Sequence, residues 1–267
     1  MGYTQEQIKK YFERIEFNGV ADRTSKTLSA IQSAHLEHIP YENIDILNGI
    51  ALSLDENDLF DKMVTEKRGG YCFEQNGLLL AVLQGLGFEV TQFCGRFILG
   101  ETGIADRRHR VLRVKADDGV FICDVGVYGE SPRKCLRFVE NEIQNDGICE
   151  YKYIKDDFYG WIECQREQGK DWKNIYGFTT EEWLSNDFVQ PSFFCEKHPE
   201  SAFTGILKAG IFRGKKSLTF IDKDFTVYAD AKVQMKKTIL SAEETQKVLS
   251  ENFNLDIALE LVERKFR

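Results

Sequence analysis

The stretch RGGYCFEQNG, residues 68–77, places Cys72 directly after two glycines and directly before an apolar segment. Glycine adopts backbone angles that other residues resist, so we expect a turn before Cys72 and a helix that begins at or just after it. A thiolate at a helix N-terminus faces unpaired N–H groups, which lower its pKa, and Arg68 adds a positive charge nearby. Unpaired cysteines pack more often than they react. Taken alone, Cys72 is therefore either a nucleophile or a buried structural thiol.

A thiol nucleophile needs a general base, and the base needs an orienting group. His109 opens the segment HRVLRVK, and Asp124 closes the segment VFICDV. A hairpin about ADDG, residues 116–119, pairs Val111 with Asp124 and places His109 on the same face, because side chains alternate with a period of two. A slip of one residue separates His109 from Asp124, which leaves a strand-end histidine and an unrelated turn aspartate. In the paired register, Cys72, His109 and Asp124 form the constellation of thiol acyl transfer.

Hydrophobic periodicity predicts the elements that position these residues. Helices are expected over 4–15, over 28–36 with an end before Pro40, and over 72–85 with a stop at Gly85 and Gly87. Short segments rich in Val, Ile and Phe predict antiparallel strands within 88–99, 109–115, 120–128, 135–143 and 150–167. Further on we expect a helix over 179–190, a hairpin about residues 222–224, and one or two helices over 241–267 that start at a capping box of Ser241 and Glu244.

Composition bounds the class of protein. The chain has 267 residues, of which 42% are hydrophobic and 29% charged, and a formal net charge of −8. A nucleic-acid partner is not expected, because phosphate binding needs a basic surface. The N-terminus lacks an apolar signal segment, and no run approaches the roughly 18 apolar residues that span a bilayer, so a membrane partner is not expected either. Seven scattered cysteines without CxxC spacing are typical of the reducing cytoplasm and predict neither a disulfide framework nor a metal site.

Several motifs together resemble the arylamine N-acetyltransferase family. Its nucleophile motif R-G-G-x-C-x-E-x-N is similar to residues 68–76, and its D-V-G motif, fifteen residues after the histidine, is similar to residues 124–126. Upstream YFERI and HIPYEN, and downstream DFVQPSFFCEKHPESAF, also resemble family segments in the same order. The resemblance runs from about residue 5 to residue 205.

The resemblance implies an α+β fold in three parts with a cysteine-protease or transglutaminase-like core. These parts are an N-terminal helical bundle over 1–86 that carries the nucleophile, an antiparallel β-barrel-like domain over 87–190 that carries the histidine and aspartate, and a C-terminal α/β lid over 191–267. It further implies that Arg14, Glu42 and Arg68 form a buried charged cluster that braces the first part. His35 and His38 are expected to be structural.

The resemblance also implies an acetyl-CoA-dependent N-acetylation of arylamines, arylhydrazines or similar small amines. Acetyl-CoA is then the acetyl-donor substrate, and no cofactor is tightly bound. The implied catalytic residues are Cys72, His109 and Asp124. Coenzyme contacts are expected from Arg108, Gly126 and Phe203, and the amine pocket from Tyr71, Val127 and Tyr128. The oxyanion is expected to meet the N–H of Cys72 and one near Arg108 or His109. The enzyme is expected to be a monomer or a weak homo-oligomer.

The sequence departs from the family pattern near the amine pocket. Val127 and Tyr128 stand where the family has Phe-Gly, Arg108 stands in place of a common Thr, and Ser192 in place of Asn. Val127 removes a stacking surface and Tyr128 adds bulk, so the acceptor preference of this chain is expected to differ. Two alternatives remain open at this point: another Cys-His-Asp enzyme, such as a transglutaminase or an amide hydrolase, and a non-catalytic binding module that retains the fold.

Overall fold

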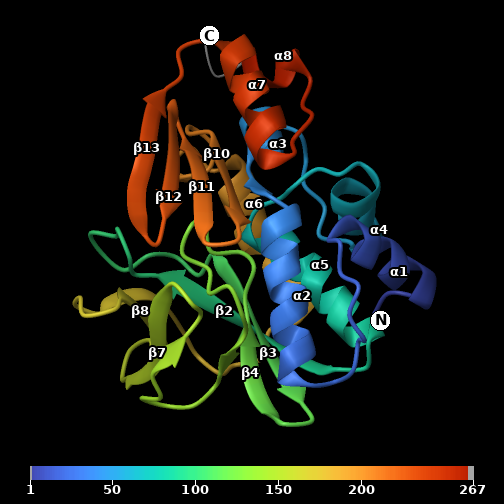
Figure 1. Ribbon diagram of the computed structural model, residues 1–267, viewed down its shortest axis with the longest axis vertical. Helices are drawn as coiled ribbons and strands as arrows, with labels where there is room; N and C mark the ends of the chain where they lie inside the picture. Colours follow the sequence, from blue (N-terminus) through green and yellow to red (C-terminus); the bar gives the residue numbers. More distant parts are fainter. Residues whose placement is uncertain (1, 264–267) are drawn as a thin grey trace.

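The computed structural model describes residues 2–263. Two antiparallel sheets lie on one side of a group of helices (Figure 1). Residue 1 and residues 264–267, which include the end of the expected C-terminal helix, lie outside the described residues. None of the described helices is long and apolar enough to cross a membrane.

The N-terminal part is helical, as the periodicity predicts. Its helices are α1 (Gln5–Arg14), α2 (Ser25–His38), α3 (Ile44–Leu47), α4 (Glu56–Phe60), the π-helix η1 (Asp61–Thr65) and α5 (Cys72–Gly85). Thr4 closes a capping box with Gln7, and α2 ends before Pro40. Every α5 residue from Cys72 to Leu83 is buried, so this helix runs through the core with other elements around it.

The second part is an antiparallel sheet that nearly closes into a barrel. Its strand order is β5-β4-β3-β2-β9-β8-β7-β6. The strands are β2 (Glu89–Phe97), β3 (His109–Ala116), β4 (Gly119–Cys123), β5 (Leu136–Arg137), β6 (Gln144–Asn145), β7 (Cys149–Asp156), β8 (Gly160–Glu167) and β9 (Lys173–Phe178). The Gln144 side chain bonds the backbone N–H and C=O of Arg137, so it links the two edge strands.

The third part is a five-stranded sheet covered by two helices, seen at the top of Figure 1. It comprises β10 (Lys208–Arg213), β11 (Lys216–Ile221), β12 (Asp224–Ala229), β13 (Lys232–Thr238), α7 (Ala242–Phe253) and α8 (Leu259–Glu263). The hairpin about residues 222–224 is present, with Asp222 at a positive φ of 56°. Ser241 caps α7 by accepting from the N–H of Glu244.

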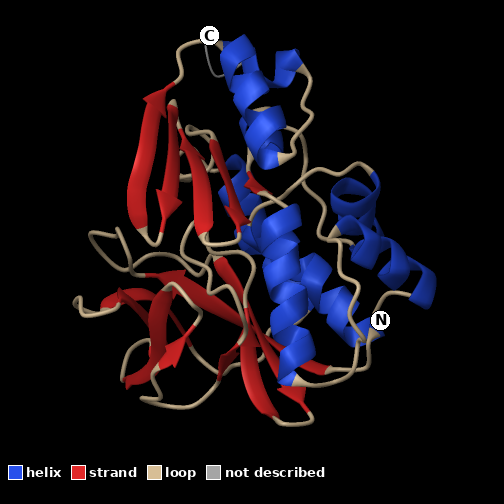
Figure 2. Cartoon of the chain, in the orientation of Figure 1, coloured by secondary structure: helices blue, strands red, loops and turns tan. Residues whose placement is uncertain are grey.

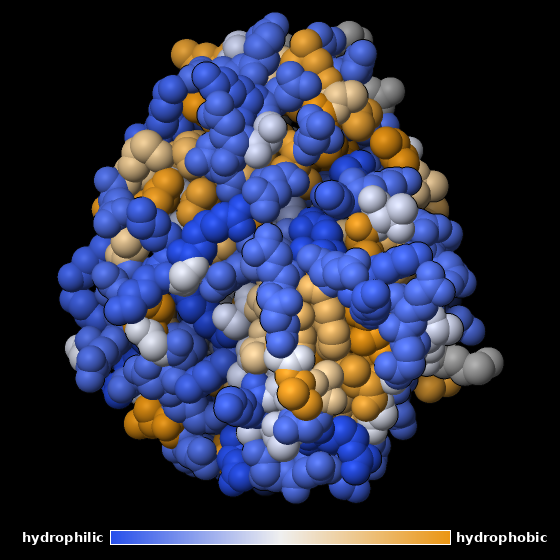
Figure 3. Space-filling view, turned by 45° about the vertical axis from the view of Figure 1, so that its right-hand side comes forward, coloured by the Kyte–Doolittle hydropathy of each residue, from blue (hydrophilic) through white to orange (hydrophobic). Residues whose placement is uncertain are grey.

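The three-part division with boundaries at 86/87 and 190/191 stays a prediction. The sheet of the third part takes its edge strand from the first part, because β1 (Tyr41–Glu42) pairs with β10. The helices pack along the side of the sheets (Figure 2). From the helical side, the surface is largely hydrophilic, with apolar side chains in separate patches (Figure 3).

The predicted helix over 179–190 is wrong in its first half. A 3-10 helix, η2 (Ser185–Phe188), and then α6 (Val189–Lys197) follow a segment without helical structure. The N–H of Trp183 donates to the carbonyl of Gln92 at 2.9 Å, and that of Leu184 donates to the Asp187 carboxylate at 2.7 Å. The bond to Gln92 holds the segment against β2, so a tertiary contact overrides its local helical pattern. The strand expected within 135–143 is likewise reduced to the two residues of β5.

Candidate active site

The Cys72 thiol lies at the first residue of α5 and is 1% exposed. The preceding turn needs its first glycine, because a Cβ on Gly69 would lie 2.1 Å from the carbonyl oxygen of Pro40. Glu74 fixes the helix start by accepting from the N–H of Tyr71 at 3.0 Å. The thiol donates to the Arg108 carbonyl at 3.4 Å, which brings Cys72 to the backbone immediately before His109.

The predicted contact between His109 and Asp124 is present. The β3–β4 hairpin has the expected register, with Leu112 opposite Cys123. β4 ends at Cys123, so Asp124 lies one residue beyond the strand instead of closing it. His109 Nε2 and Asp124 Oδ2 are 2.5 Å apart, and both side chains are almost fully buried.

The surroundings of this pair hold both side chains in place. Asp124 Oδ1 accepts 2.8 Å hydrogen bonds from the Asn76 amide and from the N–H of Gly126. The rings of Phe97 and Tyr176 flank the imidazole, with centroids 4.9 and 4.8 Å from it. When the Nε2–H of His109 donates to the Asp124 carboxylate, Nδ1 is the ring atom that is free to accept a proton. Nδ1 is buried and has no hydrogen-bond partner within residues 2–263.

The expectation of a lowered thiol pKa is wrong for the isolated Cys72 side chain. Burial raises the pKa of Cys72 well above its ordinary value, and the nearby Cys195 thiol and Asp124 carboxylate add to the rise. Arg68 does not offset this, because its guanidinium pairs with Glu42 and Asp45 at 2.7 and 2.8 Å. A buried thiolate therefore needs a proton acceptor that becomes a cation beside it, which is the chemistry of a thiolate–imidazolium pair.

A pocket of about 220 Å³ opens beside the buried triad. Five of the residues expected to contact coenzyme or amine line it: Arg108, Gly126, Val127, Tyr128 and Phe203. The fold thus brings these residues together around one pocket, although they come from three separate segments of the chain. Other lining residues include Tyr41, Phe97, Glu101, Glu130 and Lys208, which the motifs did not indicate.

Tyr71 occupies a different place from the pocket residues. It is fully buried, and its hydroxyl hydrogen-bonds Ser192 at 2.6 Å. Its ring packs edge-on against Phe203 at 5.6 Å. Ser192 therefore serves as the hydrogen-bond partner of Tyr71, and Tyr71 packs against Phe203, which lines the pocket.

One expectation about backbone groups needs correction. Gly126 is required by the close approach of the D-V-G turn to the nucleophile, because a Cβ on it would lie 2.8 Å from Cys72 Cα. The N–H of Arg108 donates to the Gly95 carbonyl at 3.0 Å and is not free to meet an oxyanion. The N–H of Cys72 remains a candidate, since the first N–H groups of a helix lack intrahelical acceptors.

The buried charged cluster has a different membership from the one expected. Arg68 pairs with Glu42 and Asp45, and Lys62 pairs with Asp45 and Glu74 at 2.7 Å each. Arg14 is not an ion-pair member, because its guanidinium donates to the backbone carbonyls of Met63, His38 and Lys67. The cluster therefore anchors the start of α5, and Arg14 ties together the loops behind it.

Sequence reasoning missed several polar side chains of the core. Arg110 is 2% exposed and donates to Gln92 and to the carbonyl of Phe73. Glu163 is fully buried and accepts from Tyr153 and Tyr176 at 2.8 and 3.1 Å. Alternation along the strands marks such positions as inward, but nothing local identifies their distant partners. His35, by contrast, is structural as expected and bonds Tyr11 at 2.8 Å.

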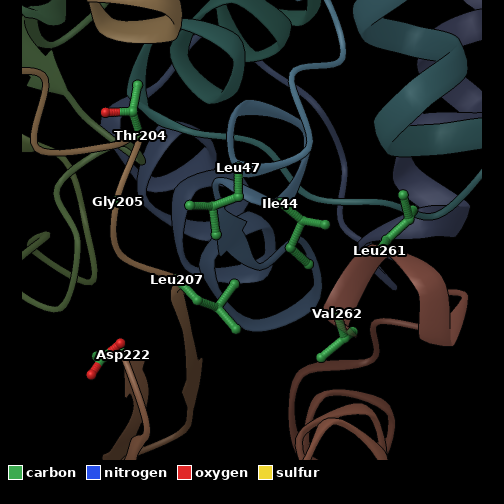
Figure 4. Close-up of a pocket in the computed structure, with 8 residues that line it drawn as sticks. All are labelled: Ile44, Leu47, Thr204, Gly205, Leu207, Asp222, Leu261 and Val262. Atoms are coloured by element: carbon green, nitrogen blue, oxygen red, sulfur yellow. The ribbon is translucent and has the colours of Figure 1, made fainter. Parts of the chain in front are cut away.

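A second cavity, of about 210 Å³, lies away from the triad between α3, α8 and the loop before β10 (Figure 4). Ile44 and Leu47 face Leu207, Leu261 and Val262 across it. Most of its lining residues are apolar, and none of them is a sequence neighbour of a triad residue. Arg108 and Gly126, which line the first pocket, lie next to His109 and Cys72, so the first pocket is the candidate active site. Within residues 2–263, no three His, Cys, Asp or Glu side chains are grouped to hold a metal ion.

Comparison with known proteins agrees with this fold. A family model described as N-acetyltransferase matches residues 24–262. The arylamine N-acetyltransferase of Escherichia coli K12 is 31% identical over 254 residues, which cover 94% of this chain and 89% of that protein. The solved arylamine N-acetyltransferase of Salmonella typhimurium superposes with a TM-score of 0.90 at 28% identity, over 96% of this chain and 93% of that one.

A CoA-bound relative has the same fold. The structure of Mycobacterium marinum arylamine N-acetyltransferase in complex with CoA matches 97% of each chain with a TM-score of 0.90 at 26% identity. The fold and the family match define an acyltransferase. The chain belongs to the arylamine N-acetyltransferase family.

Proposed function

We propose that this enzyme transfers an acetyl group from acetyl-CoA to arylamines, arylhydrazines or similar small amines by a ping-pong mechanism through an acetyl-cysteine at Cys72. One observation carries the proposal. Asp124 holds Nε2 of His109 at 2.5 Å and leaves the buried Nδ1 without a partner among the described residues, beside a thiol that needs a proton acceptor. The CoA complex of the Mycobacterium marinum relative supports acetyl-CoA as the donor.

In the first half-reaction, His109 takes the Cys72 proton on Nδ1 and the thiolate attacks the thioester carbonyl. Asp124 stabilises the imidazolium that results. The tetrahedral intermediate collapses as the C–S bond to the coenzyme breaks, and the coenzyme thiolate leaves with the proton from His109. One thioester replaces another, so little free energy is lost.

In the second half-reaction, the amine nitrogen attacks the acetyl carbonyl on Cys72, and His109 accepts its proton. The bond from the acetyl carbon to sulfur breaks, the amide departs, and Cys72 returns to its starting state. We propose Arg108, Gly126 and Phe203 as coenzyme contacts and Val127 and Tyr128 as amine contacts, because all five line the pocket next to Cys72. Tyr71 acts on this pocket through Phe203.

We also propose a cytoplasmic location. All seven cysteines are unpaired, which is typical of a reducing compartment. A monomeric or weakly oligomeric state stays a prediction.

Incubation with acetyl-CoA followed by mass spectrometry tests the proposal. We expect an adduct of about 42 Da on the peptide that contains Cys72, its loss on adding an arylamine, and its absence in Cys72→Ala. Hydrolysis of a peptide amide without this adduct would instead indicate a transglutaminase-like or hydrolytic enzyme. Equal coenzyme release by wild type and Cys72→Ala would indicate a binding module.

A further inference from the structure

Lys208 brings an ammonium group to the catalytic pocket. It opens β10 and lines the pocket, with Nζ 5.2 Å from the ring centroid of Phe203. Burial lowers its pKa below the ordinary value, and the nearby Arg108 charge lowers it further. The Glu101 carboxylate and the Cys72 thiol raise the pKa of Lys208 and partly offset this lowering, so the ammonium and the nucleophile share one electrostatic environment.

This ammonium has no salt-bridge partner within the part of the chain that the structure describes. No carboxylate of residues 2–263 forms a salt bridge with Lys208. The two carboxylates that line the pocket have other partners. Glu101 pairs with Arg108. Lys173 and a hydrogen bond with Gln165 lower the pKa of Glu130 and so partly offset the rise that burial causes.

A partly buried cation without a salt bridge is costly, and an anion that enters the pocket would offset this cost through a charge-assisted hydrogen bond. The space beside Lys208 suits an aromatic anion. A cavity of 150 Å³ is known to admit benzene, and this pocket measures about 220 Å³. Phe97, Tyr128 and Phe203 supply apolar ring surface around it.

We propose that Lys208 is a specificity-determining residue that binds a substrate carboxylate in the catalytic pocket. The inference rests on the proposed function and adds the chemical class of the substrate. The carboxylate has two possible sources: the ring carboxylate of an acceptor such as an aminobenzoate, or the terminal carboxylate of a dicarboxylic acyl group on CoA. Both present the same group to Lys208, and the experiment separates them.

The acceptor arm compares 4-aminobenzoate with its uncharged methyl ester, with acetyl-CoA as donor. We expect the ratio of kcat/KM for acid over ester to fall roughly 10- to 100-fold in Lys208→Met, since hydrogen bonds between charged groups contribute on that scale. Lys208→Arg keeps the charge and should retain most of the ratio. Methionine is similar in length and apolar, so packing over Phe203 is largely kept.

The donor arm compares succinyl-CoA with butyryl-CoA in the absence of any acceptor, by the rate of acyl-Cys72 formation. If the carboxylate comes from the acyl group, Lys208→Met lowers the succinyl-to-butyryl ratio by the same factor and leaves the acceptor ratio as in wild type. Lys216→Met is the matched control, because Lys216 is exposed on the neighbouring strand β11. Both ratios should match wild type in this control.

The proposal is wrong if Lys208→Met changes neither ratio. It is also wrong if the variant only raises KM for acetyl-CoA with both acceptors alike, because Lys208 would then bind the coenzyme. Calorimetric binding of 4-aminobenzoate to wild type and Lys208→Met needs no turnover. If wild type forms no acyl-Cys72, the proposed function fails, and this titration still decides whether Lys208 binds the carboxylate.

Discussion

Asn76 donates a 2.8 Å hydrogen bond to Asp124 across 48 positions of the chain. The bond joins α5, which begins with the nucleophile, to the turn that carries the orienting carboxylate. Asn76 also donates to the Arg110 carbonyl at 2.7 Å and accepts from the N–H of Val125 at 3.0 Å. A single buried amide thus sets the position of the helix relative to the hairpin.

Replacing Asn76 with alanine should lower the rate of acetyl-Cys72 formation roughly 10- to 100-fold, because a hydrogen bond to a charged group that orients His109 is lost. Single-turnover kinetics with acetyl-CoA measure this rate. Asn57→Ala, at an exposed position of α4, is the matched control and should react like wild type. A normal rate in Asn76→Ala would show that Asp124 is oriented without the amide.

The thiolate of Cys72 should depend on His109. Because burial raises the pKa of the isolated thiol, His109→Gln should move the pH midpoint for alkylation of Cys72 by iodoacetamide upward. Peptide mapping separates Cys72 from the other six thiols, and Cys72→Ala confirms the assignment. An unchanged midpoint would mean that another group accepts the proton.

The charged cluster at the start of α5 should contribute strongly to stability. In Glu42→Ala, Arg68 loses one of its two carboxylates, and the N–H of Ile44 loses its 2.7 Å acceptor. We expect a loss of about 3 to 5 kcal/mol in the free energy of unfolding, measured by urea denaturation. Glu13→Ala, which breaks an exposed pair with Lys9 in α1, should cost no more than about 0.5 kcal/mol. Equal costs would refute a bracing role.

Glu163 should make stability fall as the pH rises. Burial, with Asp124 nearby, raises the pKa of Glu163 to about 8 from an ordinary value of 4.5. Below pH 4.5 the carboxyl is neutral in both states. Between pH 4.5 and 8, unfolding releases a proton, so the free energy of unfolding falls by up to about 1.4 kcal/mol per pH unit. Above pH 8 the carboxyl is ionised in both states, and this contribution is fully lost.

Glu163→Gln removes this titration and should flatten the stability difference between pH 5 and pH 8 relative to wild type. Urea denaturation of both proteins at the two pH values measures it. The comparison cancels titrations that the two proteins share. If the free energy of unfolding changes equally between the two pH values in both proteins, Glu163 is already ionised in the folded protein at neutral pH.

Helix ends and one contact of the active site could be predicted from the sequence, because they depend on residues close together in the chain. The helix start at Cys72 follows from its glycines, and the contact of His109 with Asp124 follows from strand alternation once ADDG sets the hairpin register. Helix ends at Thr4, Pro40 and Ser241 were equally local, because caps and breakers act within a few residues.

Tertiary structure decided what depends on distant neighbours. Burial, which no local pattern measures, reversed the direction of the Cys72 pKa shift. Contact with Gln92 converted the predicted helix at 179–184 into a docked segment. The close approach of Cys72 Cα explained why residue 126 is a glycine. The lack of a salt bridge to Lys208 within residues 2–263 gave this pocket residue its importance. Desolvation and long-range packing arise only when segments far apart in the chain meet, so sequence periodicity alone does not contain them.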